Sequence, residues 1–413
     1  MMERNILVVQ AGGPTQVLNA TLASIVEEAR GSGAFLRILG ARSAMRGLAK
    51  GQVADLTGLS AQDLRVLRST PGAALGASRY PLKAEDLTAI LQHLERLRVS
   101  DVLAIGGNGT MHAAGLLADR ARKAGRLIRI VGVPKTVDND LERTDRSPGY
   151  ASAARYIAQV TCDLAADVRS MPQPVSILET MGRSVGWLAA AAAATKQDEA
   201  EAPHVVLLPE RPFVLDRFLG QVDECVTRRG WCVVVAAEGL RDPQGRMVYE
   251  VEDPAQADPL KRSITGGVAQ YLADRVAQHL KLRCRSEKPG LLGRSSMQHV
   301  ASQDREDAEL VGRAGVRALL EGGSERMVSL RSLRSTETSG YDLVPLIEVA
   351  GIERPIPGEW IRDGDVPLGA PFFQYIRPLI GQLGSHPQIT LPDYPPRFRE
   401  TASEEERKHV IKF

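Results

Sequence analysis

The sequence lacks a strong excess of charge of either sign. Its 413 residues contain 52 Lys and Arg against 50 Asp and Glu, a formal net charge of +2. Chains that bind nucleic acid usually carry a basic patch or stripe, and no lysine- or arginine-rich block stands out here. We therefore expect no nucleic-acid partner, and an anionic ligand has to be met by a few basic side chains gathered in one site.

Cysteines and long apolar runs are also scarce. No stretch approaches the roughly 20 apolar residues of a membrane span, and the chain opens on a strand-like run rather than on the long apolar segment of a signal peptide. The cysteines show neither C-x-x-C nor metal-ligand spacing, which predicts reduced thiols that pack as small apolar side chains. We expect a cytoplasmic protein without a membrane partner; its four cysteines are at 162, 225, 232 and 284.

Short apolar runs alternate with amphipathic stretches over much of the chain. Nearly continuous apolar strands that alternate with helices predict parallel sheets covered on both faces. Beyond about residue 325 the alternation is expected to fade into an irregular segment rich in proline. Strands are predicted at 6–10, 36–40, 102–105, 128–133, 175–178, 205–208 and 232–236, and helices at 20–29, 85–97, 110–124, 151–168 and 188–195.

Two glycine-rich runs follow predicted strands, and ligands of parallel sheets bind at the carboxyl ends of strands. Gly12 and Gly13 precede a helix, where backbone N–H groups and the helix N-terminus favour an anion; a plain tight turn is an equally good interpretation. The run 106–110, Gly-Gly-Asn-Gly-Thr, is a better phosphate loop, because Thr110 can cap the helix while the glycines leave room for a ligand. A similar run occurs in NAD kinases and lipid kinases.

Two charged clusters follow further strands. Residues 134–140, Pro-Lys-Thr-Val-Asp-Asn-Asp, combine two carboxylates, an amide, a hydroxyl and a lysine. Phosphoryl transfer needs such a mixture of a base, a metal ligand and a cation, whereas a polar turn is the alternative. Residues 179–183, Glu-Thr-Met-Gly-Arg, deliver a glutamate and an arginine, for which a surface salt bridge is the alternative.

These runs together resemble the phosphofructokinase family, and the similarity covers nearly the whole chain. The family fold implies two Rossmann-like three-layer α/β/α domains with the active site in the cleft between them. We expect a donor-binding domain over 1–142 plus about 296–350, a sugar-phosphate-binding domain over 143–295, and a C-terminal wrap of irregular and helical segments over 351–413. The matching motifs lie in family order at 12–20, 75–79, 106–110, 134–140, 148–158, 179–187, 236–240, 289–312 and 372–381.

The resemblance implies a role for each matching residue in an Mg²⁺-dependent transfer to a sugar phosphate, a reaction of glycolysis. Asp138 is the expected base for the 1-hydroxyl of fructose 6-phosphate, with Lys135, Thr136 and Asp140 beside it. Asn108 and Asp140 are the candidate metal ligands. The donor phosphates are expected at Gly13, Arg79, Gly107, Asn108, Gly109 and Thr110, and the sugar phosphate at Met181, Gly182, Arg183, Glu238 and Arg294.

Oligomeric state and donor also follow from the resemblance. Arg285 matches an arginine that reaches the neighbouring subunit's site, which implies a homodimer or homotetramer. Lys135 stands where pyrophosphate-using members carry lysine and ATP-using members glycine. Gly109, however, stands where pyrophosphate users usually carry an acidic residue. We weight Lys135 more, because it adds a specific charge, and predict a pyrophosphate-dependent enzyme; an ATP-dependent sugar-phosphate kinase is the alternative.

Three positions depart from the family pattern. Asn108 replaces an aspartate associated with Mg²⁺ in many relatives, Leu291 replaces a His or Tyr beside the sugar phosphate, and Pro174 falls where ATP-type relatives place an intersubunit arginine. They leave open another acceptor such as sedoheptulose 7-phosphate, or a catalytically weakened protein that binds a sugar phosphate.

Overall fold

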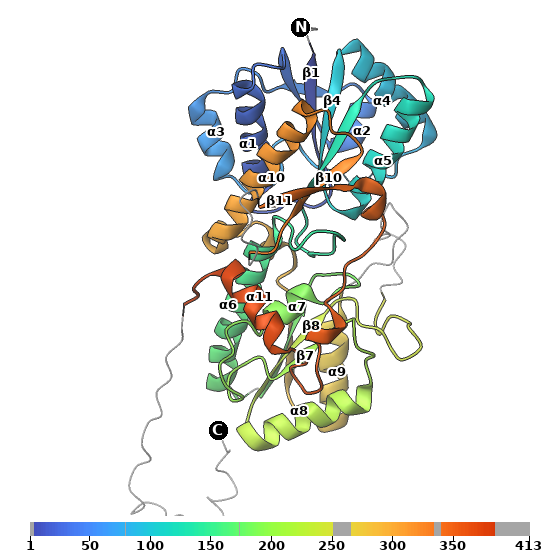
Figure 1. Ribbon diagram of the computed structural model, residues 1–413. Helices are drawn as coiled ribbons and strands as arrows, with labels where there is room; N and C mark the ends of the chain where they lie inside the picture. Colours follow the sequence, from blue (N-terminus) through green and yellow to red (C-terminus); the bar gives the residue numbers. More distant parts are fainter. Residues whose placement is uncertain (1–3, 79, 173, 251–265, 334–339, 385–413) are drawn as a thin grey trace, which may run out of the picture.

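The chain folds around two β-sheets. The structure is a computed structural model, which describes residues 4–78, 80–172, 174–250, 266–333 and 340–384. Figure 1 shows the first sheet with its helices in the upper half of the molecule and the second in the lower half. Both sheets are covered by helices on their two faces, so the expected pair of three-layer α/β/α units is confirmed.

The larger sheet has seven strands in the order β11-β10-β5-β4-β1-β2-β3. Its five inner strands are parallel, and the two outer strands, β3 and β11, are antiparallel to their neighbours. The strands are β1 (Asn5–Gln10), β2 (Arg37–Ala41), β3 (Val53–Asp55), β4 (Val99–Gly106), β5 (Arg129–Pro134), β10 (Arg326–Leu330) and β11 (Tyr341–Pro345).

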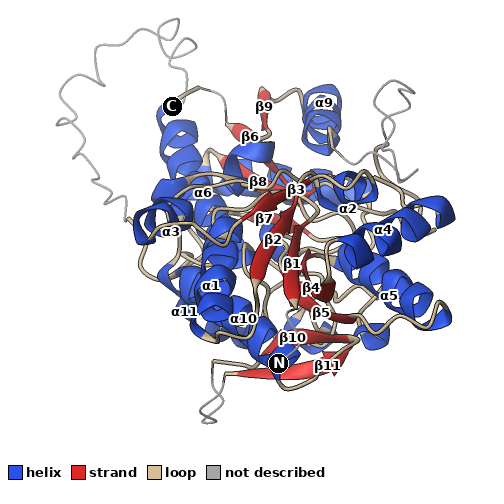
Figure 2. Cartoon of the chain, turned by 90° about the horizontal axis from the view of Figure 1, so that it is seen from above, coloured by secondary structure: helices blue, strands red, loops and turns tan. Residues whose placement is uncertain are grey.

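Alternate side chains of the central strand β1 enter opposite cores, as the period of two in a strand requires. Ile6 and Val8 pack toward α1 (Leu18–Gly31), α3 (Ala61–Arg68) and α10 (Ser302–Leu320). Leu7 and Val9 pack toward the other face, which is covered by α2 (Ala44–Ala49), α4 (Ala84–Arg96) and α5 (Asn108–Lys123). The view from above in Figure 2 shows these two groups of helices on opposite sides of the sheet.

The smaller sheet is wholly parallel, in the order β7-β8-β6-β9. Its strands are β6 (Val175–Thr180), β7 (Val205–Leu207), β8 (Cys232–Ala237) and β9 (Cys284–Glu287). One face packs against α8 (Leu215–Arg229) and α9 (Val268–Leu280). The other packs against α6 (Tyr150–Ser170), α7 (Trp187–Ala191) and α11 (Ala370–Ile380).

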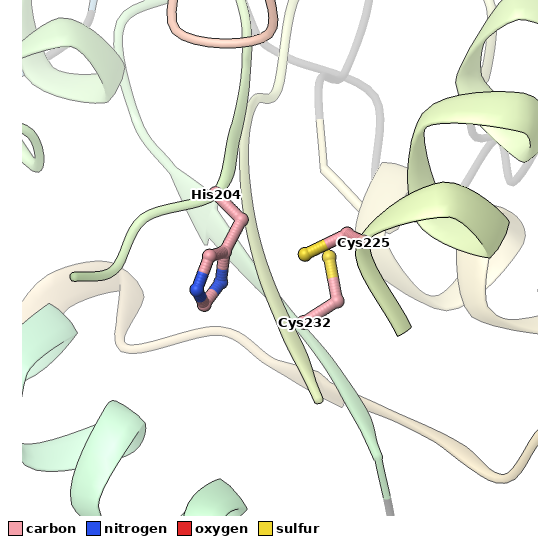
Figure 3. Close-up of side chains that lie close together, drawn as sticks. All are labelled: His204, Cys225 and Cys232. Carbon is pink, nitrogen blue, oxygen red and sulfur yellow. The ribbon is translucent and has the colours of Figure 1, made fainter. Parts of the chain in front are cut away.

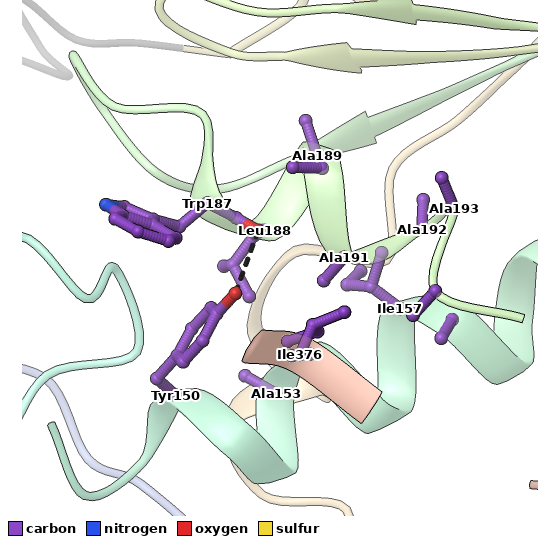
Figure 4. Packing of buried hydrophobic residues seen from close by; sticks show 14 of the residues in the cluster. Tyr150, Ala153, Ile157, Trp187, Leu188, Ala189, Ala191, Ala192, Ala193 and Ile376 are labelled. Atoms are coloured by element: carbon purple, nitrogen blue, oxygen red, sulfur yellow. Dashed lines mark hydrogen bonds between the residues drawn. The ribbon is translucent and has the colours of Figure 1, made fainter. Parts of the chain in front are cut away.

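Small side chains at α7 allow three helices to pack closely. Trp187 is fully buried, and the Tyr150 hydroxyl of α6 donates a hydrogen bond of 3.2 Å to its carbonyl oxygen (Figure 4). The alanines at 189–194 are all buried, as predicted for this segment. The predicted helix is too long, because after Ala191 the backbone N–H groups bond three residues back, in the tighter 3₁₀ manner.

The expectation that regular structure fades after residue 325 is wrong for 326–330 and 341–345, which form β10 and β11. β10 extends the larger sheet by pairing parallel to β5, and β11 returns antiparallel along its edge. The antiparallel return is short and half-exposed, so its sequence carries only a weak apolar pattern. In the described part of the chain, the connections contain the 3₁₀ helices η2 (Gly290–Arg294), η3 (Met297–His299), η4 (Leu346–Glu348) and η5 (Gly358–Trp360). Among the described helices, we find none with the length and apolar character of a membrane span.

Candidate active site

The segments after β1 and β5 meet through a lysine. Lys135 directly follows β5, and its Nζ donates a hydrogen bond of 2.7 Å to the carbonyl oxygen of Gly13. A Cβ added at Gly12, whose φ is +77°, would lie 2.9 Å from this Nζ, and one added at Gly13 would lie 2.5 Å from Nη1 of Arg294. The glycines therefore let two cationic side chains approach the backbone of the turn.

Four ionisable groups, on segments that follow strands of both sheets, surround Asp138, which is half-buried. Burial and the carboxylates of Asp140 and Glu238 raise the pKa of Asp138 to about 7. The positive charges of Arg183 and Lys135 oppose this rise. Because β5 belongs to the larger sheet whereas β6 and β8 belong to the smaller, the carboxyl ends of strands from both sheets face one another here.

The segments after β6 and β8 are joined to each other. The backbone N–H of Arg183 donates a hydrogen bond of 3.1 Å to Oε1 of Glu238. Arg183 has a φ of +53° and Gly182 one of +141°, and a side chain at Gly239 would collide with the Arg183 backbone. Met181 packs against the core around α7. The two loops thus form one surface that carries a carboxylate and a guanidinium.

The run 107–110 forms the start of α5, next to the segment after β5 that contains Lys135 and Thr136. A Cβ at Gly107 would lie 3.5 Å from the carbonyl oxygen of Lys135 and 3.6 Å from Cβ of Thr136. Thr110 is buried, whereas Gly109 is exposed and a Cβ there would meet nothing within 4 Å. The positive end of α5 therefore opens beside the aspartates, with free space at the position of Gly109.

Asn108 and Asp140 offer oxygen atoms suited to a hard cation. Asn108 Nδ2 donates hydrogen bonds to the backbone oxygen of Asp140 at 3.2 Å and to its Oδ2 at 3.4 Å. Oδ1 of each residue is buried without a hydrogen-bond partner. A buried acceptor without a partner is costly, and Mg²⁺ binds carboxylate and amide oxygens. The pair therefore fits Mg²⁺, and burial raises the pKa of Asp140.

Of the residues predicted for the site, one lies away from this cluster and one cannot be placed in it or outside it. Arg79 lies outside the described residues. Arg285 is exposed on the edge strand β9 and is paired with Ser176 of β6. Because Ser176 is four residues before the end of β6, Arg285 lies roughly 13 Å back from the carboxyl end of the sheet.

Glu179, which the sequence pattern presented as a site candidate, instead caps a helix. Its carboxylate accepts hydrogen bonds from the backbone N–H groups of Gly267 at 2.8 Å and Ala269 at 3.1 Å, at the N-terminus of α9. Lys288 Nζ lies 3.1 Å from the same carboxylate, which is buried. Glu179 does form an ion pair, as the alternative interpretation expected, but its carboxylate is buried rather than on the surface. It therefore holds α9 against β6.

Sequence reasoning missed the contacts that hold the turn between the two aspartates. Asn139 has a left-handed φ of +58°; its Nδ2 donates a hydrogen bond of 2.9 Å to the Tyr375 hydroxyl and its Oδ1 accepts one of 3.1 Å from the Ser147 N–H. The Tyr375 hydroxyl donates in turn to the carbonyl oxygen of Asp145 at 2.8 Å. Helix α11 therefore fixes the aspartate turn from 236 residues away in the sequence.

Replacing Tyr375 by Phe should lower kcat about tenfold, because the Asn139 side chain loses its acceptor and the turn relaxes. The KM for the acceptor should change much less, since the Tyr375 hydroxyl bonds to Asn139 and Asp145, which are not among the residues expected to bind the acceptor. Steady-state kinetics measure both. Tyr150→Phe is the matched control, because it removes a buried hydroxyl that bonds Trp187 instead; equal losses of kcat in both variants would contradict a specific role of Tyr375.

Comparison with known proteins agrees with this geometry. The family described as "Phosphofructokinase" matches residues 5–319. A Xanthomonas campestris pv. campestris protein named pyrophosphate–fructose 6-phosphate 1-phosphotransferase is 37% identical over 390 residues, which are 92% of each chain. An Alkalicoccus urumqiensis protein named sulfofructose kinase is 34% identical over 86% of this chain and 91% of its own. The crystal structure of a pyrophosphate-dependent phosphofructokinase from Nitrosospira multiformis superposes with a TM-score of 0.81 at 30% identity, covering 95% of this chain and 96% of that one.

Proposed function

Because the chain belongs to the phosphofructokinase family, we propose that it transfers a phosphoryl group from pyrophosphate to the 1-hydroxyl of fructose 6-phosphate. The product is fructose 1,6-bisphosphate. The observation that carries the donor assignment is the placement of Lys135 Nζ against the Gly13 carbonyl, beside Asp138. It puts a fixed positive charge between the glycine turn and the base.

In the proposed reaction Asp138 accepts the proton of the 1-hydroxyl as this oxygen attacks the phosphorus of the donor. A base whose pKa is near the working pH is well matched to this task, and the pKa of Asp138 is raised to about 7. Thr136 accepts a hydrogen bond of 3.1 Å from the Asp138 backbone N–H and orients the turn. The phosphoryl group leaves the donor as the new O–P bond forms.

The donor lies in this proposal against Lys135, Gly13 and the N-terminus of α5. Lysine acts as a point charge on a phosphate. The N–H groups of Gly107, Asn108 and Gly109 at the start of α5 can donate to phosphate oxygens, whereas that of Thr110 donates to the Gly107 carbonyl oxygen at 2.8 Å. Asn108 and Asp140 would hold Mg²⁺. When bound, Mg²⁺ neutralises charge on the donor phosphates.

The acceptor is assigned to Arg183, Glu238 and Arg294. The arginines suit the acceptor's phosphate and the carboxylate of Glu238 suits sugar hydroxyls. Arg285 belongs to the neighbouring subunit's site in this proposal, which makes the protein at least a homodimer. The exposed edge strand β9 that carries Arg285 supports such an interface.

The proposal is tested by incubating the purified protein with fructose 6-phosphate and Mg²⁺, with either pyrophosphate or ATP, and measuring fructose 1,6-bisphosphate. Product with pyrophosphate alone is expected. Product with ATP alone would support the alternative based on the open space at Gly109. Product with neither would overturn fructose 6-phosphate as acceptor. Sulfofructose, the sugar in the name of one relative, and sedoheptulose 7-phosphate should then be assayed.

Lys135→Gly should lower kcat/KM for pyrophosphate by about 10²–10³-fold, the usual cost of removing one group that stabilises developing charge. Any rate with ATP should fall much less, because the longer donor makes other contacts. Lys281→Gly is the control, since Lys281 is exposed with a φ of +58° that glycine adopts freely. An equal fall for both donors would contradict donor selection by Lys135.

A further inference from the structure

A histidine and two cysteines converge at the amino end of the smaller sheet, away from the candidate active site. His204 precedes β7, Cys225 lies in α8 and Cys232 is the first residue of β8. One nitrogen of the imidazole and the two Sγ atoms all lie within 4.8 Å of one another. Figure 3 shows the two sulfur atoms facing each other, with the imidazole ring beside them. These residues are 7 and 21 positions apart in sequence, so their spacing matches no metal motif, and the prediction of inert packing cysteines did not foresee the cluster.

The separations are close to those of a tetrahedral metal site. Zn–S bonds of about 2.3 Å and Zn–N bonds of about 2.0–2.1 Å place neighbouring ligand atoms about 3.5–3.8 Å apart. Reaching these separations from a ceiling of 4.8 Å takes shifts of about 1 Å or less at each atom. Cys232 is buried and Cys225 partly buried, so the cluster is shielded without being sealed.

The hydrogen bonds of His204 prepare it as a ligand. Its Nε2 lies 3.3 Å from the carbonyl oxygen of Ala200, to which it donates when it carries the proton. A metal-binding histidine commonly donates its second nitrogen to a backbone carbonyl in this way. Nδ1 then keeps its lone pair and accepts a hydrogen bond of 3.0 Å from the Val233 N–H. Exchange of that bond for a bond to the metal is the main rearrangement that the site requires.

We propose that His204, Cys225 and Cys232 bind one thiophilic divalent cation, with Zn²⁺ as the expected ion and a water molecule as fourth ligand. Two thiolates neutralise the charge of the ion, which matters because Lys196 and Arg229 lie near enough to act on His204 electrostatically. The site joins three separate segments, so its role is to hold α8 against the start of β7 and β8.

This site is distinct from the magnesium ligands and from the reacting groups. Cys232 begins β8 and Glu238 directly follows its last residue, so the two are six residues apart, which corresponds to about 20 Å. Soft thiolate ligands select zinc, whereas the oxygens of Asn108 and Asp140 select magnesium. Zinc binding should therefore leave the phosphotransferase rate in excess Mg²⁺ unchanged within about twofold, and raise thermal stability through its linkage to folding.

The test measures metal content and ligand type directly. The purified full-length protein is reduced, incubated with Zn²⁺ in the presence of excess Mg²⁺, and desalted before elemental analysis; one zinc per chain is expected. Replacement of zinc by Co²⁺ should give the absorption of a tetrahedral thiolate site. Cys225→Ser and Cys232→Ser should each weaken binding by at least about 100-fold, since even changes outside the first ligand shell cost 10–100-fold. Cys284→Ser, on β9 of the same sheet, is the control and should bind normally.

Failure of the reduced wild-type protein to retain zinc would overturn the proposal, whether or not the variants fold. Retention of one zinc by the double variant Cys225→Ser with Cys232→Ser would also overturn it, because the ligands would then lie elsewhere. A thiol titration of the unfolded, metal-free protein that finds two thiols fewer than four would show a disulfide between the two cysteines and contradict a metal site.

Discussion

Replacing Asp138 by Asn should lower kcat about 10²–10⁴-fold, the usual contribution of a general base, which is the role proposed for Asp138. The amide keeps the shape of the side chain but cannot accept the proton of the sugar hydroxyl. The fold should not suffer, because the half-buried carboxylate of Asp138 lies beside those of Asp140 and Glu238, which raise its pKa to about 7 together with burial. The variant should unfold at the same temperature as the parent or a higher one.

Steady-state kinetics check the rate, with the donor that the product assay identifies. Calorimetry checks the affinity for the sugar phosphate, which should stay within about threefold of the parent. A group that acts only in the transition state affects kcat rather than binding. Glu142→Gln is the matched control, since it removes a negative charge from the same connection two residues after Asp140. A kcat for Asp138→Asn within tenfold of the parent would remove Asp138 from the role of base. A similar fall of kcat in both variants would indicate that the loss of negative charge, rather than the loss of a proton acceptor, causes the effect.

The strands that could be predicted are those with continuous apolar runs, such as β1, β5 and β8, because both of their faces are buried. β3, β9 and β11 escaped prediction because they are edge strands with half-exposed residues, and β10 escaped although four of its five residues are buried. Their pairing depends on neighbouring strands that cannot be identified from the local sequence. The end of helix α7 escaped for a related reason, since alanine suits an α-helix and a 3₁₀ turn alike.

Within the site, the residues that could be predicted are those directly after strands. Lys135 and Asp138 follow β5 and Arg183 follows β6, and parallel topology brings such positions to one edge. The sequence could not show that Glu179 turns away to cap α9, or that Tyr375 reaches the aspartate turn. Both depend on contacts between segments 88 or more residues apart.

The junction between the two sheets depends on a buried ion pair. Arg146, in the connection from β5 to α6, donates from Nε and Nη2 to the two carboxylate oxygens of Asp307 in α10, at 2.6 and 2.7 Å. Arg146 also donates to the carbonyl oxygen of Arg331 at 2.6 Å. One turn earlier in α10, Asp304 accepts hydrogen bonds from the N–H groups at the start of α6. A helix of the larger sheet thus holds the first turn of a helix of the smaller one.

Asp307→Ala should lower the free energy of unfolding by about 3–5 kcal/mol, because it leaves the buried guanidinium of Arg146 with only the partly exposed carboxylate of Asp145, at 3.4 Å. Denaturant unfolding measures this loss, and with two sheets the first transition is the one to compare. Glu306→Ala, an exposed neighbour in the same helix, should change the stability by less than about 0.5 kcal/mol.

A double variant separates the cost of the unpaired charge from the worth of the pair itself. Arg146→Met combined with Asp307→Leu removes both charges and keeps apolar volume, so it should regain most of the stability lost in Asp307→Ala. If the double variant is as unstable as the single one, the geometry of the ion pair itself joins the two sheets. A loss below about 1 kcal/mol in Asp307→Ala would instead mean that solvent reaches Arg146 when its partner is gone, and that the Asp304 contacts hold the junction.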